Sequence, residues 1–557
     1  MKWLLIGFFA FPSISLWARS LVYQYPFPSV KEMSQWDGDW WEEPGRPLVP
    51  VVWAKLLIPY GEKFHSLTFK VNSTASQKNR GPLRIAAIPK PLCQASSRQL
   101  PVETPKEPLA PGELFPPTVI GKPLPLIKNG YEILYVPLFP FIVDTENTLS
   151  VSGVQLTLTV EPSSKTAVTY RGSEEDQKLV LDLIDNPEVI SSYPSRRPGT
   201  IAQYLVIGPK AYLESDATSF FLANKVSRGI TSETVATEDI SAQTPGADLA
   251  AKIRATILNR YQNSGTQFVL LVGNGFSITP TRILTVSNEN IPSDLYFGCL
   301  DGSGTSGASI DLACEVAVGR APVSTLEEWQ TFVMKSLKMH FVNPSDPEVR
   351  NVLNFGEKMD SSTLAGPMVE QLLTGGKAGQ ITTVGYPSQI TSQKLYETFS
   401  KTFSAQEVIQ SLNSGDFYTV NHLGHASETY CMRFQDTDIP KLTNPFPFFA
   451  ITQGCHPGDL RGKNWASKLL LSNTGGAGAI IANSSFGWYQ PNSSDGPSNR
   501  HHLVFYDTVF KEKITYLGKA NQRAKERLLP QAASNTTLRK VLLETNLLGD
   551  PEIALKF

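Results

Sequence analysis

The sequence predicts two folded regions, an all-β sandwich or jelly roll followed by an α/β domain with a mostly parallel sheet. At 557 residues the chain is too long for one ordinary core. Its first part holds short runs of alternating apolar and polar residues, whereas continuous apolar strands alternate with helical patterns from Tyr204 onward. A hydrophobic content of 41% and a charged content of 18% indicate a globular protein.

Residues 1–18 have the pattern of a secretory signal peptide. Lys2 precedes a short apolar run that ends in small residues, with cleavage expected after Ser15 or Ala18. The run is shorter than the roughly 20 residues that span a bilayer. We therefore expect export to the periplasm, the cell surface or the medium. No later stretch of the sequence is long and apolar enough to predict a transmembrane span.

Residues 19–165 are expected to form the β region. Strand-like runs separated by Pro, Gly and Asn are found at 51–59, 66–71, 131–136 and 154–160. Residues 166–200 are polar and are expected to be a linker. They end near Arg196 and Arg197, in the kind of exposed loop that proteases cut. Both a maturation site and an ordinary connection fit this composition.

Residues 201–557 are expected to form the α/β domain. Tyr204–Gly208 and Phe268–Gly273 read as buried strands, and further strands are expected near 316, 351, 419, 448 and 477. Leu249, Ile253, Ile257 and Tyr261 recur every four residues, which indicates an amphipathic helix. Such alternation predicts a parallel sheet covered on both faces, with functional sites at the carboxyl ends of its strands.

Two of these predicted strands end at reactive side chains. Residues 419–429 contain an apolar run followed by Gly424 and His425, and residues 448–459 contain one followed by Gly454 and Cys455. A neighbouring imidazole can convert a thiol into a nucleophilic thiolate. The pair therefore predicts a hydrolase with a cysteine nucleophile, although a buried Cys is more often a small apolar side chain.

Other histidines compete for the role of base. His422 lies three residues before His425 on the same predicted strand, so the two side chains should point to opposite faces. We expect His422 to be structural. His456 should point away from Cys455 for the same reason and be exposed or supporting.

The sequence resembles the gingipain family of cysteine peptidases, which have a caspase-like fold. Four stretches carry the resemblance in the family's order, and a turn-rich run resembles the start of the gingipain-type propeptide. They are residues 293–302 with 315–325, 424–429, 454–455 and 547–552, and the propeptide-like run is 42–50. The resemblance implies a cysteine endopeptidase made as a zymogen, with its own N-terminal prodomain and a protein or peptide substrate as partners.

The resemblance also implies roles for individual residues. Cys455 would be the nucleophile and His425 the base. Backbone N–H groups near Ala426 and Gly454 would hold the oxyanion. Glu315 would orient the imidazole, although a surface or salt-bridged Glu fits the sequence equally well. Ala426 stands where similar peptidases commonly have Gly, and this change favours the alternative of a non-catalytic binding or assembly protein that kept the fold.

Charge, metal ligands and cysteines set the remaining expectations. A net charge of -1 gives no reason to expect nucleic-acid binding. The His and Cys spacing matches no standard zinc pattern, and no cofactor is expected. Asp294 and Asp301 are loop carboxylates suited to a basic substrate side chain or a structural calcium ion. Among five cysteines, Cys299 and Cys314 are the nearest pair for a bridge, and Cys455 is expected to be free.

Overall fold

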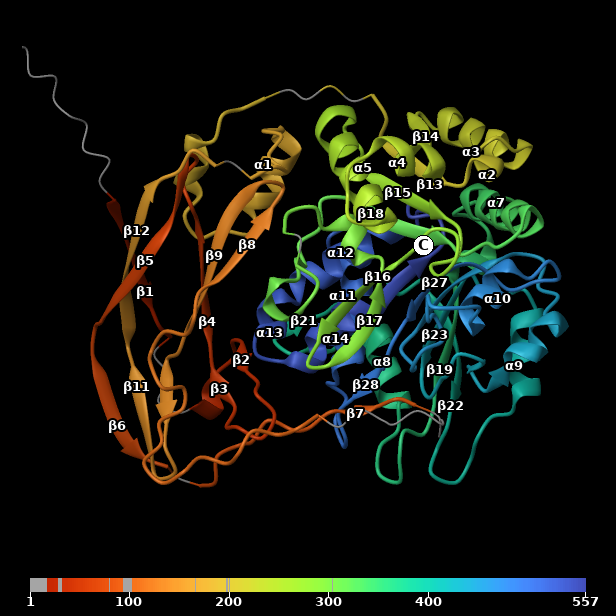
Figure 1. The fold of residues 1–557 in the computed structure, drawn as a ribbon. Helices are drawn as coiled ribbons and strands as arrows, with labels where there is room; N and C mark the ends of the chain where they lie inside the picture. Colours follow the sequence, from red (N-terminus) through yellow and green to blue (C-terminus); the bar gives the residue numbers. More distant parts are fainter. Residues whose placement is uncertain are drawn as a thin grey trace, which may run out of the picture.

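The computed structural model describes residues 18–28, 33–79, 81–93, 103–165, 167–196, 199, 201–302 and 304–557. A β-rich region lies beside a larger α/β domain (Figure 1). Most of the expected signal peptide, residues 1–17, lies outside the described residues, as do Arg197 and Pro198 of the candidate maturation loop. No helix in the described part of the chain is long and apolar enough to cross a membrane.

The N-terminal region is all-β through residue 162, as the sequence predicts. Its strands form three-stranded sheets in the orders β1-β12-β5, β10-β11-β6 and β4-β9-β8. Alternating burial along β12 turns Leu156, Leu158 and Val160 inward, where they share a core with Leu56 and Leu134. The strands are β1 (Arg19–Pro26), β2 (Trp40–Trp41), β3 (Val49–Pro50), β4 (Val52–Leu57), β5 (Glu62–Val71), β6 (Thr74–Lys78), β7 (Lys90–Pro91), β8 (Leu124–Lys128), β9 (Tyr131–Leu138), β10 (Phe141–Val143), β11 (Asn147–Val151) and β12 (Gly153–Pro162).

The expected linker is more structured than its composition predicts. It contains helix α1 (Glu174–Leu181), capped by Ser173, and the 3-10 helix η2 (Pro187–Ser192). The side chain of Asn186 accepts from the Leu57 N–H at 2.8 Å, and the Tyr193 hydroxyl donates to the Ile58 carbonyl at 2.7 Å. These contacts attach the segment to β4, so it packs on the N-terminal region.

A ten-stranded sheet organises the α/β domain, in the order β14-β13-β15-β18-β29-β27-β26-β23-β19-β22. Every neighbouring pair is parallel except β27 and β29, which run antiparallel. The sheet therefore consists of two parallel halves that run in opposite directions. The strands are β13 (Tyr204–Gly208), β14 (Ser232–Ala236), β15 (Phe268–Val272), β18 (Ala317–Ala321), β19 (Asn351–Gly356), β22 (Thr391–Tyr396), β23 (Thr419–Leu423), β26 (Phe448–Thr452), β27 (Ala477–Asn483) and β29 (Thr545–Leu548).

Helices cover both faces of this sheet, which explains why its strands are apolar throughout. Phe448 and Ala450 of β26 enter one buried cluster, whereas Phe449 and Ile451 enter another on the opposite face. The longer helices are α3 (Asp216–Ser227), α5 (Leu249–Ser264), α7 (Leu326–Phe341), α8 (Gly366–Thr374), α9 (Ala405–Asn413), α10 (Trp465–Leu471), α11 (Pro497–Phe510), α12 (Leu517–Arg527) and α14 (Thr536–Glu544).

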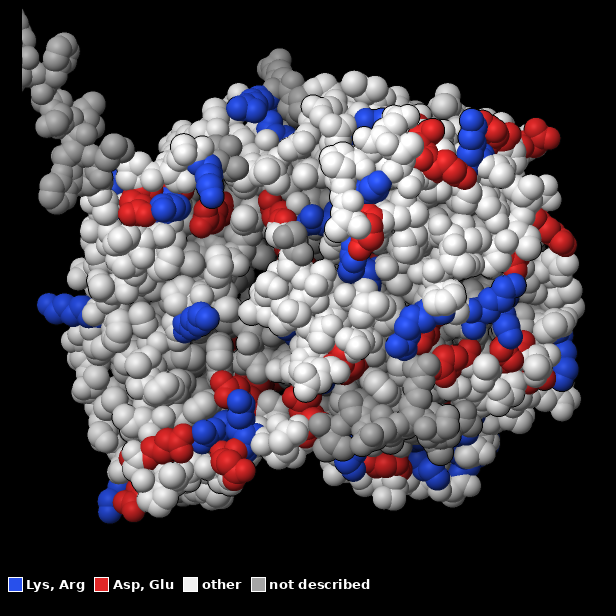
Figure 2. Space-filling view, viewed as in Figure 1, with Lys and Arg blue, Asp and Glu red and all other residues white. Residues whose placement is uncertain are grey.

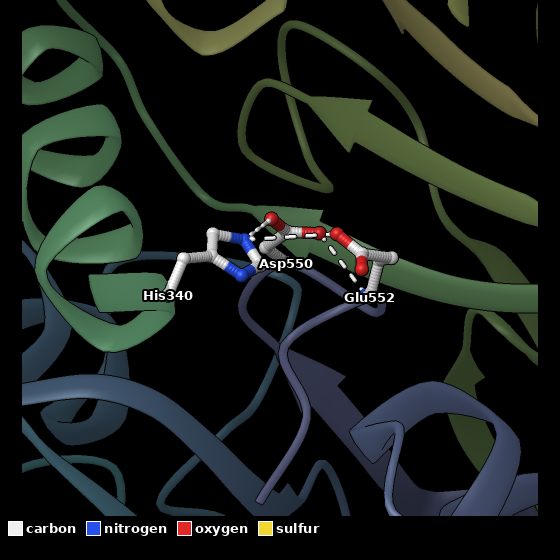
Figure 3. Close-up of side chains that lie close together, drawn as sticks. All are labelled: His340, Asp550 and Glu552. Carbon is white, nitrogen blue, oxygen red and sulfur yellow. Dashed lines mark hydrogen bonds and ion pairs between the residues drawn. The ribbon is translucent and has the colours of Figure 1, made fainter. Parts of the chain in front are cut away.

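A buried charge cluster forms where the C-terminal motif closes the domain (Figure 3). Asp550 and Glu552 lie 2.5 Å and 2.8 Å from the ammonium group of Lys225, which is fully buried. His340 of α7 lies 2.7 Å from Asp550, and Arg228 pairs with Glu552. The protein's own cations neutralise these carboxylates, so the cluster is structural. On the outside, the face in Figure 2 shows acidic and basic side chains interspersed, in keeping with the small net charge.

Candidate active site

Two neighbouring strand ends bring the predicted nucleophile and base to one edge of the sheet. β23 and β26 run parallel, with His422 opposite Thr452 in register. The chain leaves these strands as Gly424-His425-Ala426 and Gly454-Cys455. A Cβ atom on Gly454 would lie 2.4 Å from that of Ala426. Glycine at 454 therefore permits the two loops to touch.

His425 is held by backbone contacts in one tautomer. Its Nε2 lies 2.9 Å from the Met359 carbonyl oxygen, which only accepts hydrogen bonds, so the ring proton is on Nε2. Its Nδ1 is buried and has no hydrogen-bond partner among the described residues. The backbone N–H of His425 donates to Glu357 at 3.1 Å. The imidazole thus offers one unprotonated nitrogen to a thiol or a substrate.

His422 is fixed as a structural residue. Its Nε2 lies 3.0 Å from Glu357 and its Nδ1 lies 2.8 Å from the Thr452 hydroxyl, all fully buried. Burial disfavours the imidazolium, but the interactions with the Cys431 sulfur and the Glu357 carboxylate outweigh burial and raise the pKa of His422 to about 10. Both ring nitrogens have hydrogen-bond partners, so neither is available to take a proton from a thiol.

Two backbone amides of the site converge on one oxygen. The N–H groups of Ala426 and Cys455 donate to the carbonyl oxygen of Leu92 at 3.2 Å and 3.3 Å. Ala426 is not among the residues with positive φ, so Ala in place of Gly introduces no strain there. The Gly454 N–H turns instead to the Thr452 hydroxyl at 3.5 Å. Two convergent amides beside a cysteine sulfur have the geometry of an oxyanion hole.

Cys455 is not free, and the sequence-based expectation on this point is wrong. It forms a disulfide with Cys93 of the N-terminal region, with Cα atoms 5.1 Å apart and a sequence separation of 362. The expected bridge between Cys299 and Cys314 is present. Cys431 is the free thiol, buried beside His422. Nothing in the sequence signals this pair, because only the fold brings Cys93 next to Cys455.

Leu92 and Cys93 reach the site at the end of a strand that the N-terminal region adds to β28 (Trp488–Tyr489). β7 (Lys90–Pro91) pairs antiparallel with β28, and Figure 1 shows the orange β7 segment reaching from the β-rich region to β28. The Leu92 N–H continues this pairing by donating to the Gly487 carbonyl at 2.7 Å. An extended peptide bound by backbone pairing is one of the general modes of peptide recognition.

The structure does not bring Glu315 to His425, so the predicted third member is corrected. Glu315 accepts from the N–H groups of Leu300 at 2.7 Å and Asn129 at 3.2 Å. It precedes β18, which lies four strand positions from β23 in the sheet. At about 4.8 Å per neighbour this separation is about 19 Å. The Met359 carbonyl, not a carboxylate, orients the imidazole.

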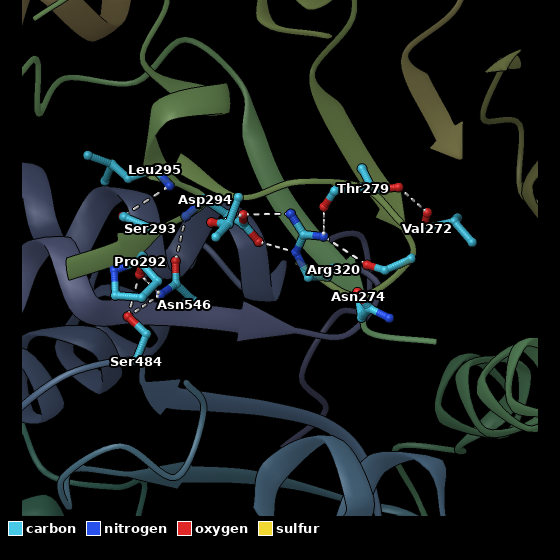
Figure 4. Close-up of polar contacts among 12 residues, drawn as sticks. Val272, Asn274, Thr279, Pro292, Ser293, Asp294, Leu295, Arg320, Ser484 and Asn546 are labelled. Atoms are coloured by element: carbon cyan, nitrogen blue, oxygen red, sulfur yellow. Dashed lines mark hydrogen bonds and ion pairs between the residues drawn. The ribbon is translucent and has the colours of Figure 1, made fainter. Parts of the chain in front are cut away.

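Asp294 is likewise occupied elsewhere (Figure 4). Its two oxygens bind the buried guanidinium of Arg320 at 2.6 Å and 2.7 Å, and one also accepts from the Thr281 hydroxyl at 2.9 Å. Its charge is therefore neutralised inside the domain, and the predicted contact with a substrate side chain is corrected.

A carboxylate cluster around Glu315 has the chemistry of a hard-cation site. Oxygens of Asp301, Asp311 and Glu315 lie within 4.8 Å of one another. Burial raises the pKa of Asp311 to about 7, and it also raises the pKa values of Asp301 and Glu315. One oxygen each of Asp301 and Asp311 lacks a hydrogen-bond partner among the described residues. Oxygen-only ligands suit calcium, so these residues fit the structural ion considered from the sequence.

Comparison with known proteins identifies the family. The model of peptidase family C25 matches residues 197–556. The chain belongs to this family, the gingipain family of cysteine peptidases. Among solved structures, the Arg-specific cysteine proteinase gingipain R (RgpB) matches with a TM-score of 0.50 and 21% identity, over 65% of this chain and 80% of that one. This similarity confirms the caspase-like fold predicted from the sequence.

Another gingipain-family match is more distant, and curated sequences add nothing. A complex of the pro- and mature domains of RgpB from Porphyromonas gingivalis matches with a TM-score of 0.49 and 20% identity, over 64% of this chain and 80% of that one. No curated protein sequence matches the chain.

Sequence reasoning missed several residues of the site. Glu357 follows the end of β19 and could have been found by the same strand-end rule that singled out His425 and Cys455. The Met359 carbonyl, Leu92 and Cys93 carry no comparable signal, because a backbone oxygen and a distant segment have no local pattern.

Proposed function

We propose that the protein is an exported cysteine endopeptidase, made as a zymogen, that works through Cys455 and His425. One observation carries the proposal: the amides of Ala426 and Cys455 hold a single peptide carbonyl directly beside the Cys455 side chain. The unpaired Nδ1 of His425 in the neighbouring loop supports it. Export rests on the signal-like residues 1–18.

The reaction follows from these positions once Cys455 is reduced. Nδ1 of His425 takes the thiol proton, and the thiolate attacks the carbonyl carbon of the bound peptide. The amides of Ala426 and Cys455 stabilise the oxyanion, which develops where the Leu92 oxygen lies. His425 then returns its proton to the leaving amine. Water, activated by the same imidazole, releases the acyl group, and no cofactor takes part.

The N-terminal region is the prodomain in this proposal. Its β7 segment occupies the peptide-binding edge, and further contacts anchor it to the catalytic domain. Glu42 pairs with the buried Arg500 at 2.7 Å, and Lys128 pairs with Glu526 at 2.6 Å. A substrate cannot pair with β28 until this segment leaves, and the bond between Cys93 and Cys455 keeps the segment in place. The full-length chain with this bond closed is therefore the latent form, and a chain without the bond can release the segment.

A thiol-labelling experiment tests the dyad. In Cys93→Ala the Cys455 thiol is free without added reductant, and mass spectrometry of a digest distinguishes its modification from that of the other free thiol, Cys431. An ordinary thiol with pKa about 8.5 is about 0.3% ionised at pH 6. We expect rapid modification of Cys455 by iodoacetamide at pH 6, slowed on the order of 100-fold when His425→Ala is added. Cys93→Ala should hydrolyse casein, and this hydrolysis should be lost when His425→Ala is added.

The matched control replaces a histidine outside the site. His65 lies on the surface of the prodomain, where its side chain is 52% exposed, so His65→Ala in the Cys93→Ala background should label and cleave normally. Equal labelling with and without His425, together with no hydrolysis, would favour a non-catalytic binding protein with the same fold.

A further inference from the structure

The segment that covers the site is bound as a substrate would be, so its side chains report what the site accepts. In an acyl-transfer site, the residue whose carbonyl enters the oxyanion hole is the one that precedes the scissile bond. That residue here is Leu92. Its side chain therefore occupies the primary subsite, and Lys90 lies two positions before it.

The primary subsite is closed and apolar. The Leu92 side chain is fully buried, in one apolar cluster with Leu423, Cys455 and Tyr489. A Lys or Arg side chain in this place would lose its hydration and would need a carboxylate partner.

Two carboxylates near the site are already engaged. Glu357 pairs with His422 at 3.0 Å, and Asp360 accepts from the Tyr489 hydroxyl at 2.8 Å. Asp360 also lies 3.8 Å from the Lys90 ammonium, whose side chain is 59% exposed. A basic residue two positions before the scissile residue therefore gains a weak, solvent-screened attraction.

We propose that the peptidase cleaves after a leucine-sized apolar residue, with a minor preference for a basic residue two positions earlier. This inference rests on the proposed function and adds its substrate class. It predicts a selectivity opposite to that stated for the Arg-specific gingipain R, with which the chain shares its fold.

Peptide substrates test this selectivity. Acyl-Lys-Pro-X-coumarylamides with X as Leu, Met, Ala, Arg or Lys would be given to the Cys93→Ala protein, with Cys455→Ala as the blank. We expect Leu to exceed Arg in kcat/KM by about 100-fold, because a buried unpaired cation is strongly disfavoured. Replacing the Lys of the peptide by Ala should lower kcat/KM by about 2- to 5-fold.

The fragments of casein distinguish a failure of the specificity proposal from a failure of the proposed function. If casein is cut and the new C-termini are mainly Arg or Lys, the specificity proposal is wrong and the proposed function stands. If neither casein nor any peptide is cut, the proposed function itself fails. New C-termini that are mainly Leu and similar apolar residues would support both.

A second inference rests on a different observation, the bond between Cys93 and Cys455. A sulfur bonded to another sulfur has no thiolate to attack the Leu92 carbonyl. Cys455 is fully buried, whereas Cys93 is partly exposed. We infer that this disulfide is a covalent latch on the zymogen, opened by a dithiol reductant that attacks the Cys93 sulfur.

The exchange balances without any other reactant. One thiolate of the dithiol bonds to the Cys93 sulfur and expels Cys455 as a thiolate, which takes a proton. The second thiol of the reductant then attacks the mixed disulfide. The products are the free Cys93 and Cys455 thiols and the oxidised reductant. Attack at the Cys93 sulfur is favoured because this sulfur belongs to the partly exposed residue, whereas Cys455 is fully buried.

Labelling of the full-length chain tests the latch. The wild type should resist iodoacetamide at Cys455 until dithiothreitol is added, whereas Cys93→Ala should label at once. The difference before reduction should be at least on the order of 100-fold. The double variant Cys299→Ala/Cys314→Ala removes the other bridge and should behave as the wild type.

A non-reducing digest gives the second readout. It should contain a peptide pair joined through Cys93 and Cys455 in the wild type, and the pair should be absent after reduction. The latch would be refuted if the unreduced wild type labelled at Cys455 as fast as Cys93→Ala, or if no such peptide pair were found.

Discussion

Two buried sites, one in each half of the ten-stranded sheet, differ in how completely their polar groups are paired. Around β18, all three guanidinium nitrogens of Arg320 donate hydrogen bonds, to Asp294 and to the carbonyls of Gly273 and Thr279. Around β23 and β26, His425 keeps one nitrogen unpaired, and the amides of Ala426 and Cys455 bind only a separate segment of chain. Buried groups with every partner present stabilise a fold, whereas groups left without a permanent partner are free to react.

His422 and His425 repeat this contrast within three residues. Glu357 contacts both, but it pairs with the ring of His422 and only with the backbone N–H of His425. The carboxylate thus fixes the charge of one imidazole and the position of the other. The two are the same type of residue, His422 on β23 and His425 just past its end, so the difference between them is the set of partners.

The largest expected effect is on kcat when His425, in the half of the sheet with β23 and β26, is replaced. His425→Ala in the Cys93→Ala background should lower kcat by about 10²- to 10⁴-fold, since the general base is removed. The midpoint of thermal unfolding should change little, because only one ring hydrogen bond is lost. Initial rates on the Leu coumarylamide and differential scanning fluorimetry measure the two quantities. A stable variant that keeps its kcat would remove His425 from the mechanism.

The second prediction concerns Arg320, where we expect stability to fall and activity to be kept. Arg320→Ala should lower the free energy of unfolding by about 3–5 kcal/mol, because Asp294 is left as a buried charge without its partner. The activity per folded molecule should be retained. Urea titration of this variant would be compared with Arg282→Ala, which breaks the exposed pair with Asp248 and should cost about 0–1 kcal/mol. Equal costs would contradict the structural assignment of Arg320.

The third prediction concerns pH and the structural histidine. The pKa of His422 is raised to about 10, above its ordinary value near 6.5. Its contribution to stability is therefore fully present below about pH 6.5 and is lost as the pH rises through about 10. Urea unfolding of wild type and His422→Gln between pH 6 and 10 should show the two curves converging as the pH rises. A constant difference would mean that His422 is not charged in the folded protein.

The smallest expected effect is at Glu315. Glu315→Gln in the Cys93→Ala background should leave kcat/KM within about 2-fold, since about 19 Å separates it from β23. Glu357→Gln is the variant for comparison. The Glu357 side chain holds the backbone of His425, so this substitution should lower kcat. A large loss of kcat for Glu315→Gln, with folding intact, would restore it to the catalytic set.

Local pattern was sufficient for much of the architecture. The residue pattern of a strand reflects how many of its faces are covered. One covered face gives the alternation along β12, and two covered faces give the continuous apolar runs of β13, β15 and β26. The strand-end rule placed His425 and Cys455 at one edge. The linker was harder, because Asn186 and Tyr193 are held by contacts with β4 that a polar composition does not reveal.

The sequence by itself determined the class of both regions, the family and the strand ends at which Cys455 and His425 lie, because each depends on residues close together in the chain. The tertiary structure decided which polar groups are occupied. Glu315 and Asp294 are consumed by partners from other segments, and Cys455 is bonded to a cysteine 362 residues away. Pairings of this kind depend on which segments the fold brings together, and no local pattern encodes them.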